Sequence, residues 1–310
     1  MDDFLSVSAQ QQRLSKLNEI SSSASTNSAP TLPTADAIKN AESSLLSSSS
    51  TAYLQAHATE DTVSHITEAI IPALNGQAQS SRYYGFVTGG VLPIAEWADN
   101  IVTHFDQNVQ VHLPNQSIAT SVESVTLKML ADLLRLNDGG GASTADAFPG
   151  KTFTTGATAS NVLGLACGRE AVLAKRLGTV AEGSVGELGL LEACLRAGVK
   201  EIQILTSGGH SSLSKAASIV GLGRCSVKEL GLDADESWRL DLLAVERELK
   251  RPNVASIIAV SVGEVNTGGL ALNGIEEWKS LRALADQYGA WIHADGGKSL
   301  AAQVNKGCMA

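Results

Sequence analysis

The sequence predicts an α/β protein whose sheet is mainly parallel and carries helices on both faces. The observation behind this prediction is that, after Phe148, short β-branched runs alternate with segments of helical periodicity. Parallel strands that follow one another must be joined by crossovers, which are usually helical, so the alternation calls for such a sheet. Ligands of these sheets bind beyond the carboxyl ends of the strands, and functional residues are therefore expected directly after strands.

The predicted strands are short and rich in β-branched residues, and they cover residues 152–155, 201–206, 225–230, 254–262 and 290–294. Helical periodicity between them predicts helices at residues 161–177, 212–220, 239–251 and 274–288.

The first half of the chain is predicted to be helical after a serine-rich arm. Eleven serines lie between Ser21 and Ser50 with very few large apolar groups, so this segment buries too little to offset its ordering entropy. We expect a short helix at residues 5–20, followed by this weakly ordered arm. Helical periodicity resumes at Thr59 and returns at residues 93–105 and 118–136.

Composition excludes several classes of protein. The chain has 310 residues and a formal net charge of −9, which disfavours nucleic acid as a partner. Four cysteines without a CxxC pair indicate reduced thiols in the cytoplasm, and six histidines without a ligand-like spacing give no support to a metal site. The longest apolar run, residues 254–262, is about half of what a membrane-spanning helix needs, so no membrane association is expected.

Three segments with chemical potential follow predicted strands. Residues 154–161 form a turn of small and hydroxyl-bearing residues that leads into a helix, as in phosphate-binding turns, although helix capping alone also selects such residues. His210 follows a Gly pair between a strand and a helix, where a histidine is often only a cap. Asp295 ends an apolar strand, where a half-buried carboxylate needs a partner.

In this order, the turn, the histidine and the aspartate resemble the pyridoxal-phosphate-dependent group II amino acid decarboxylases. That family includes the aromatic amino acid, glutamate and cysteine sulfinate decarboxylases, and the resemblance runs from about Ala58 to Gly297. Residues 84–90 and 106–108 look like its substrate-side segments. The resemblance implies the large domain of pyridoxal-phosphate fold type I, which is aspartate aminotransferase-like, in a homodimer that acts on an amino acid as a carboxy-lyase.

Each site residue takes its expected role from the resemblance. Ala157 and Thr158 would donate to the phosphate of pyridoxal 5'-phosphate, and Asn161 would support that turn. His210 would stack on the pyridine ring, and Asp295 would keep the ring nitrogen protonated, which makes the ring an electron sink. His210 and Asp295 are thus the expected catalytic residues.

The sequence departs from the family after Asp295. The family's Schiff-base lysine lies a few tens of residues beyond the aspartate, and no such segment is present; Lys298 and Lys215 do not match its position. Residues 263–268 also depart from the Thr-rich loop of the family. In the family, two strands that follow the aspartate strand lie between it and the first strand, and their absence would leave residues 152–155 without neighbours.

These observations predict a C-terminally truncated family member. Its regions are a serine-rich, weakly ordered N-terminal arm (1–57), a helical segment (58–147), a partial cofactor-binding large domain (148–297) and a divergent tail (298–310), without a C-terminal small domain. The tail is interpreted either as a read-through intron or as the end of a natural short paralogue. An inactive decarboxylase-family chain is expected; a non-catalytic cofactor- or partner-binding remnant and a sphingosine-phosphate-lyase-like enzyme are the alternatives.

Overall fold

The computed structural model describes residues 15, 31–80, 83, 90–136, 149–178, 183–263 and 268–296. The chain divides into two compact units, Met1–His112 and Leu113–Ala310, and each is described by itself. None of the described helices combines the length and hydropathy that crossing a bilayer requires.

The first unit is helical. Its elements are α2 (Ala35–Ser44), α3 (Thr59–His65), a π-helical turn (Ile66–Ile70), two 3₁₀ turns (Ile71–Ala73 and Gln77–Gln79) and α4 (Pro93–Phe105). The helices predicted from Thr59 and at residues 93–105 are confirmed. Helix α2 lies within the serine-rich arm and was not predicted; it begins where the Thr34 hydroxyl accepts a hydrogen bond from the Ala37 N–H. The helix predicted at residues 5–20 lies, apart from residue 15, outside the described residues.

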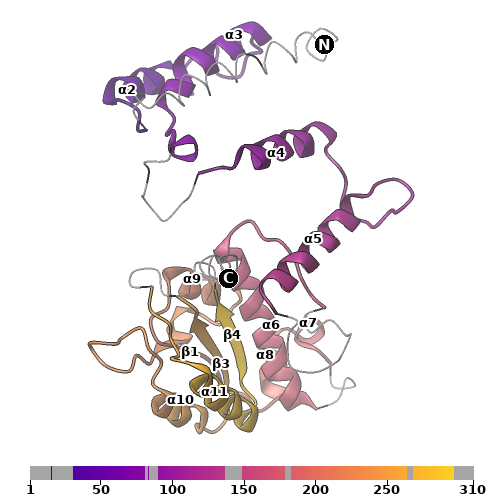
Figure 1. Ribbon diagram of the computed structural model, residues 1–310, viewed down its shortest axis with the longest axis vertical. Coiled ribbons are helices and arrows are strands. Elements are labelled where there is room, and N and C mark those ends of the chain that lie inside the picture. Colours follow the sequence, from indigo (N-terminus) through magenta and orange to yellow (C-terminus); the bar gives the residue numbers. More distant parts are fainter. Residues whose placement is uncertain are drawn as a thin grey trace, which may run out of the picture. The chain divides into compact units, whose positions relative to one another are not determined.

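The second unit contains a four-stranded parallel sheet in the order β2-β1-β3-β4 (Figure 1). Its elements are α5 (Ala119–Leu133), α6 (Ala157–Leu177), α7 (Val185–Leu188), α8 (Leu190–Arg196), β1 (Glu201–Thr206), α9 (Ser211–Ile219), η6 (Arg224–Ser226), β2 (Val227–Glu229), α10 (Leu242–Leu249), β3 (Val254–Ser261), α11 (Ile275–Tyr288) and β4 (Trp291–Asp295). All strand pairs are parallel, as predicted.

Two hydrophobic clusters cover opposite faces of the sheet. Ile204 and Ile257 pack into one cluster with side chains of α6 and α9. Their neighbours Leu205 and Ile258 point the other way, into a second cluster with α10 and α11. Because side chains alternate along a strand, consecutive apolar residues in β1 and β3 supply both cores at once. The predicted arrangement of helices on both faces is therefore confirmed.

Several predicted boundaries differ from the structure. Residues 152–155 are not a strand, because a strand needs a partner for its backbone groups and no described residue pairs with them. The strand predicted at residues 225–230 shortens to β2, because residues 224–226 form a 3₁₀ turn. Helix α10 begins after Asp241, whose carboxylate accepts hydrogen bonds from the N–H groups of Leu243 and Ala244. The short helices α7 and α8 were not predicted.

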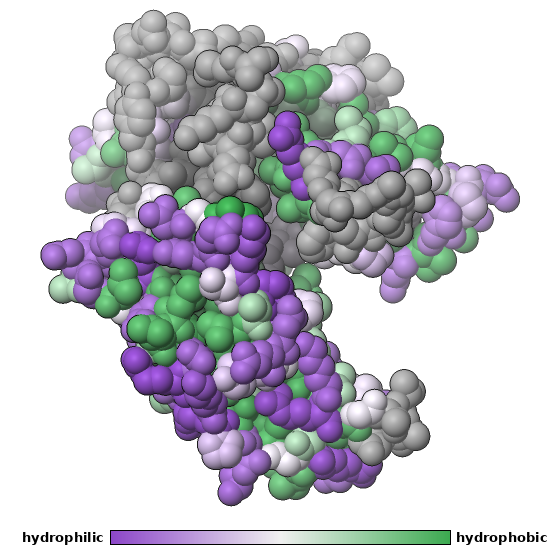
Figure 2. Space-filling view, turned by 60° about the horizontal axis from the view of Figure 1, so that its bottom comes forward, coloured by the Kyte–Doolittle hydropathy of each residue, from purple (hydrophilic) through white to green (hydrophobic). Residues whose placement is uncertain are grey.

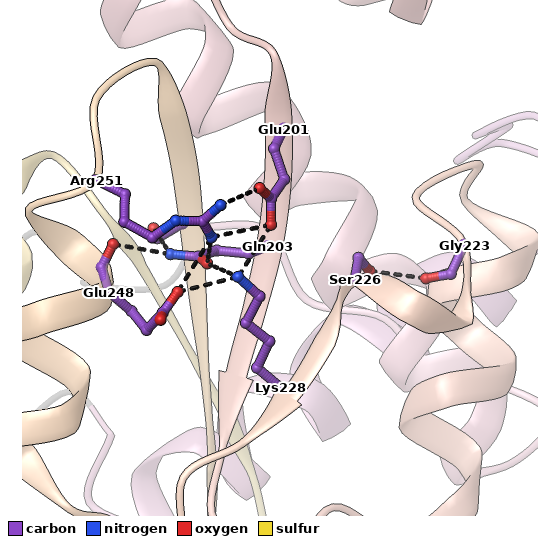
Figure 3. A network of polar contacts seen from close by, with 8 residues as sticks. Glu201, Gln203, Gly223, Ser226, Lys228, Glu248 and Arg251 are labelled. Atoms are coloured by element: carbon purple, nitrogen blue, oxygen red, sulfur yellow. Dashed lines mark hydrogen bonds and ion pairs between the residues drawn. The ribbon is translucent and has the colours of Figure 1, made fainter.

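A network of charged groups joins the amino-terminal end of β1 to β2 and α10 (Figure 3). Arg251 lies 2.6 Å from a Glu201 carboxylate oxygen and 3.1 Å from one of Glu248, and Lys228 contacts the same two carboxylates at 3.1 and 3.0 Å. The buried Gln203 amide sits among them, since its oxygen accepts from both cations. The network lies at the opposite end of β1 from its carboxyl end, so it supports the fold rather than the site.

Large apolar side chains remain exposed in both units. In α4, Ile94, Trp97 and Phe105 are each more than 60% exposed, and α5 leaves Val122, Val125 and Met129 in solvent. The face drawn in Figure 2 likewise shows hydrophobic side chains gathered into patches between hydrophilic ones. The apolar faces from which the helices α4 and α5 were predicted are thus present, but their side chains remain exposed to solvent.

Candidate functional site

The site begins at the amino-terminal end of α6. Gly156 precedes the helix with a φ of 153°, a conformation that favours glycine, and no side chain caps the first turn. The Thr154 hydroxyl contacts the Ser160 hydroxyl at 2.7 Å and donates to the Gly156 carbonyl at 3.0 Å, which shapes the turn. The exposed residues Ala157 and Thr158 therefore present backbone N–H groups at the positive end of a 21-residue helix, an arrangement suited to an anion.

Asn161, one turn into α6, is the centre of the site. Its side chain is only 2% exposed, and its amide nitrogen donates to Asp295 Oδ2 and to Ser212 Oγ, both at 3.1 Å. Its amide oxygen lies 2.7 Å from Nε2 of His293. One buried amide thus links α6 to the last two polar residues of β4 and to the first turn of α9.

His210 joins this group through Ser212. Nδ1 of His210 lies 2.8 Å from the Ser212 hydroxyl and accepts a hydrogen bond from the Ser212 backbone N–H at 3.2 Å. The imidazole therefore caps α9, as a histidine in this position often does. It is also connected through Ser212 and Asn161 to Asp295, so its capping role does not separate His210 from the other predicted site residues.

Asp295 ends β4 at the carboxyl edge of the sheet. Its backbone carbonyl accepts a hydrogen bond from Val262 N–H at 2.8 Å, which ties the end of β4 to the end of β3. Burial lowers the pKa of the neighbouring His293, and the Asp295 carboxylate opposes this shift. We expected a positively charged ring nitrogen or a helix terminus as the partner of Asp295; within the described chain, the amide of Asn161 donates a hydrogen bond to its carboxylate.

The structure brings together most of the predicted site residues. Asn161, His210 and Asp295 share one hydrogen-bonded group, and Ala157 and Thr158 lie one turn before Asn161 on the same helix. Residues 84–89 and 264–267 and the tail from 297 onward lie outside the described residues.

Three members of the site were not predicted. Ser212 and His293 stand beside predicted residues, and their proximity in sequence was the available signal. Gly164 admits the His293 ring, because a Cβ at this position would lie 2.4 Å from Nδ1 of His293. No pattern in the sequence predicts this contact between Gly164 and the His293 ring. Within the described parts of the chain, no group of three or more His, Cys, Asp or Glu side chains could hold a metal ion.

Comparison with curated proteins identifies relatives among decarboxylases, while no family model matches the chain. The chain is 26% identical over 191 residues to L-2,4-diaminobutyrate decarboxylase from Acinetobacter baumannii, covering 58% of this chain and 33% of that protein. It is 24% identical over 86 residues to a tryptophan decarboxylase from Camptotheca acuminata, covering 28% of this chain and 17% of that protein. The alignments therefore span a third or less of the length of these relatives.

Solved structures show the same fold over nearly the whole chain. The glutamate decarboxylase domain of a diaminobutyrate-pyruvate transaminase and L-2,4-diaminobutyrate decarboxylase from Vibrio parahaemolyticus superposes with a TM-score of 0.71 at 19% identity, covering 93% of this chain and 57% of that one. TDC from Oryza sativa, solved with PLP and tryptamine, gives a TM-score of 0.70 at 18% identity, covering 97% and 60%. The predicted fold class is confirmed, and the chain spans under two thirds of these structures.

Proposed function

We propose that this chain, as a partial member of the pyridoxal-phosphate-dependent group II decarboxylase family to which both comparisons point, forms part of an amino acid decarboxylase. Pyridoxal phosphate would bind at the carboxyl edge of the sheet. The observation that carries the proposal is the hydrogen-bonded group of Asn161, His210 and Asp295 beside the uncapped start of α6. The fold is that of the fold type I large domain, present in part.

The residues present fit this cofactor. Its phosphate requires donors, and the backbone N–H groups at Ala157 and Thr158 are not capped by a side chain. Its pyridine nitrogen requires a carboxylate, and Asp295 stands at a strand end, where Asn161 holds its carboxylate and Val262 holds its backbone carbonyl. Ser207, which follows β1, has a buried hydroxyl without a hydrogen-bond partner among the described residues, a feature that calls for an explanation and that a bound ligand would provide.

Each residue of the site has a distinct task in this proposal. Ala157 and Thr158 would hold the phosphate, and His210 would lie against the ring. Asp295 would keep a proton on the ring nitrogen, and Asn161 would hold the carboxylate in place for that contact. When bound, pyridoxal phosphate supplies an electron sink for the electron pair left behind as the substrate loses carbon dioxide.

No lysine of this chain matches the position of the Schiff-base lysine that the family resemblance implies. We therefore propose that it binds the cofactor by non-covalent contacts and does not release carbon dioxide from an amino acid on its own. For the complete enzyme we propose a cytoplasmic homodimer with an amino acid as substrate and no nucleic acid partner. The cysteines without disulfide-like spacing support the cytoplasmic location, and the net charge of −9 disfavours a nucleic acid partner.

Cofactor titration tests the proposal directly. We expect saturable binding of pyridoxal phosphate, followed by absorbance and by quenching of protein fluorescence, and weaker binding in Asp295→Ala and in His210→Ala. Lys279→Ala serves as the control, because Lys279 is an exposed residue of α11 that pairs with Glu276 and belongs to none of the segments proposed to contact the cofactor. Equal, non-saturable binding by all four proteins would contradict the proposed site.

Borohydride reduction followed by peptide mapping tests the chemical part. We expect no stoichiometric labelling of one lysine, and no release of labelled carbon dioxide from a panel of amino acids. Specific labelling of Lys215 together with decarboxylation would show that the chain is active by itself and would overturn the proposal of inactivity.

A further inference from the structure

We infer that Asn161 is a positioning residue that couples Asp295 to His210 through Ser212, and that the hydrogen bonds of this group, together with the burial of His293, hold His210 and His293 as neutral rings with the proton on Nε2. The relevance of this inference to catalysis rests on the proposed function. Its content rests on hydrogen bonds within the chain, which exist without the cofactor.

The direction of the hydrogen bonds is fixed first at His210. The backbone N–H of Ser212 can only donate, so His210 Nδ1, 3.2 Å away, has to accept and cannot carry a proton. The Ser212 hydroxyl, 2.8 Å from the same Nδ1, must then donate its own hydrogen. Its oxygen remains an acceptor, which suits the Asn161 amide nitrogen at 3.1 Å.

The direction is fixed a second time at Asp295. A carboxylate can only accept, so the group of Asn161 that lies 3.1 Å from Asp295 Oδ2 is the NH₂ and not the carbonyl. This agrees with the orientation that Ser212 requires, and both hydrogens of the amide are used. The two arguments start from different residues and assign the same amide orientation.

The state of His293 follows from that orientation. The Asn161 carbonyl oxygen can only accept, so Nε2 of His293, 2.7 Å away, carries the proton and donates. Burial disfavours the charged imidazolium and lowers the pKa of His293, which leaves the ring neutral and Nδ1 unprotonated. The hydrogen bond therefore places a proton on Nε2, and burial favours the neutral form of this ring.

Gly164 makes the position of His293 possible. A Cβ at Gly164 would lie 2.4 Å from both Nδ1 and Cε1 of His293, a distance that forces the ring to move. Gly168, one turn further along α6, is also crowded but less closely, by Trp291 at 2.8 Å and Ile257 at 3.0 Å. The two glycines therefore serve the same helix-to-sheet packing, and only Gly164 touches the hydrogen-bonded group.

The arrangement has a consequence for the cofactor. Asn161 cannot rotate its amide without placing its carbonyl oxygen against the Asp295 carboxylate, which is repulsive. One hydrogen of this NH₂ group therefore goes to Asp295, and the other goes to Ser212, which in turn holds His210. Loss of that group is expected to disturb both contacts together.

Nitrogen NMR of the histidine-labelled chain tests the inference without the cofactor. The chain has six histidines, and His210→Asn and His293→Asn assign the two relevant rings. At neutral pH we expect both rings to be neutral with a protonated Nε2. A protonated Nδ1 in either ring, or an imidazolium at His293, would overturn the inference.

Four variants then give a pattern that a merely structural role would not produce. Asn161→Leu should change the spectra of both rings, Ser212→Ala only that of His210, and Gly164→Ala only that of His293. Gly168→Ala should destabilise the chain to an extent similar to Gly164→Ala and leave both spectra unchanged. If Asn161→Leu does not fold, the Ser212 and Gly164 variants still decide, because uniform changes in both rings, or none, contradict the coupling.

Cofactor binding separates this inference from the proposed function. If the chain binds pyridoxal phosphate, Asn161→Leu should weaken the binding about tenfold or more, with a smaller effect of Ser212→Ala. Unchanged binding in Asn161→Leu would remove the positioning role. Failure of every protein to bind, with the NMR pattern intact, would instead contradict the proposed function and leave the hydrogen-bond assignment standing.

Discussion

The amide nitrogen of Asn161 and the carboxylate of Asp295 lie 3.1 Å apart although 134 positions separate them in the chain. The first residue stands in the opening turn of α6 and the second at the end of β4. Their hydrogen bond joins the predicted phosphate turn to the predicted pyridine contact. It therefore ties together the two ends of the proposed ligand site.

Removal of the Asn161 amide should destabilise the second unit. Asn161→Leu deletes the common partner of Asp295, Ser212 and His293 in a buried position, and we expect a loss of about 1–3 kcal/mol in the free energy of unfolding. Urea denaturation monitored by circular dichroism measures this loss. The exposed neighbour Ser160, changed to Ala, is the control and should cost less than about 1 kcal/mol. Equal effects of the two substitutions would contradict the central role of Asn161.

His293 should make the stability of the chain depend on pH. Because its pKa in the folded state lies below the ordinary value of 6.5, the unfolded chain binds the proton more readily. The contribution of His293 to stability is therefore complete above pH 6.5 and is lost as the pH falls through the lower, folded pKa. Urea unfolding between pH 8 and pH 5 should show this decline, and His293→Asn should reduce its slope. A steeper slope in the variant would show that the sign is wrong.

The charged network at the start of β1 should stabilise the fold mainly at pH values where the Glu201 carboxylate is ionised. The hydrogen bond from Arg251 is the main cause that lowers the pKa of Glu201, so its contribution is present above the unfolded pKa of 4.5 and is lost as the pH falls through the folded value. Arg251→Met should lower stability near neutral pH by a modest amount, since the pair is partly exposed, and should flatten the loss below pH 5.

A matched control for this network is available in α11. Arg282 pairs with Asp286 at 2.6 Å, but both side chains are about half exposed or more, and no buried amide joins them. Arg282→Met should therefore change stability less than Arg251→Met does. Added salt should reduce the difference between the two variants. If Arg282→Met costs as much as Arg251→Met, the network has no special role.

The exposed apolar face of α4 should bind a hydrophobic dye. Trp97 is 61% exposed and Phe105 64% exposed, on a helix with further uncovered apolar side chains. Trp97→Ser together with Phe105→Ser should lower dye fluorescence and aggregation while the urea midpoint of the second unit stays the same. Wild-type chain that remains monodisperse and does not bind the dye would show that this face is covered in solution.

The sequence by itself determined the periodic elements and the positions of the site residues along the chain. Short apolar runs that alternate along the chain with helical periodicity predicted β1, β3 and β4 and most helices. The signal is strong in β1 and β3 because these strands are buried on both faces and are therefore almost continuously apolar. The resemblance to decarboxylases predicted Asn161, His210 and Asp295, and the structure places them in one hydrogen-bonded group.

Only the tertiary structure decided which contacts these residues make. The sequence led us to expect that Asn161 supports the phosphate turn, and the structure adds that its side chain hydrogen-bonds Asp295 and Ser212. These contacts form because the sheet brings the end of β4 beside the amino-terminal part of α6. Residues 152–155 have the composition of a strand but no partner among the described residues, and composition cannot supply one. Gly164 is one more small residue in the sequence and becomes essential only where the His293 ring occupies the space of its missing Cβ. Secondary-structure propensity depends on the residues within one segment. The hydrogen-bond partners of a side chain and the space around it depend on segments that are distant in the chain.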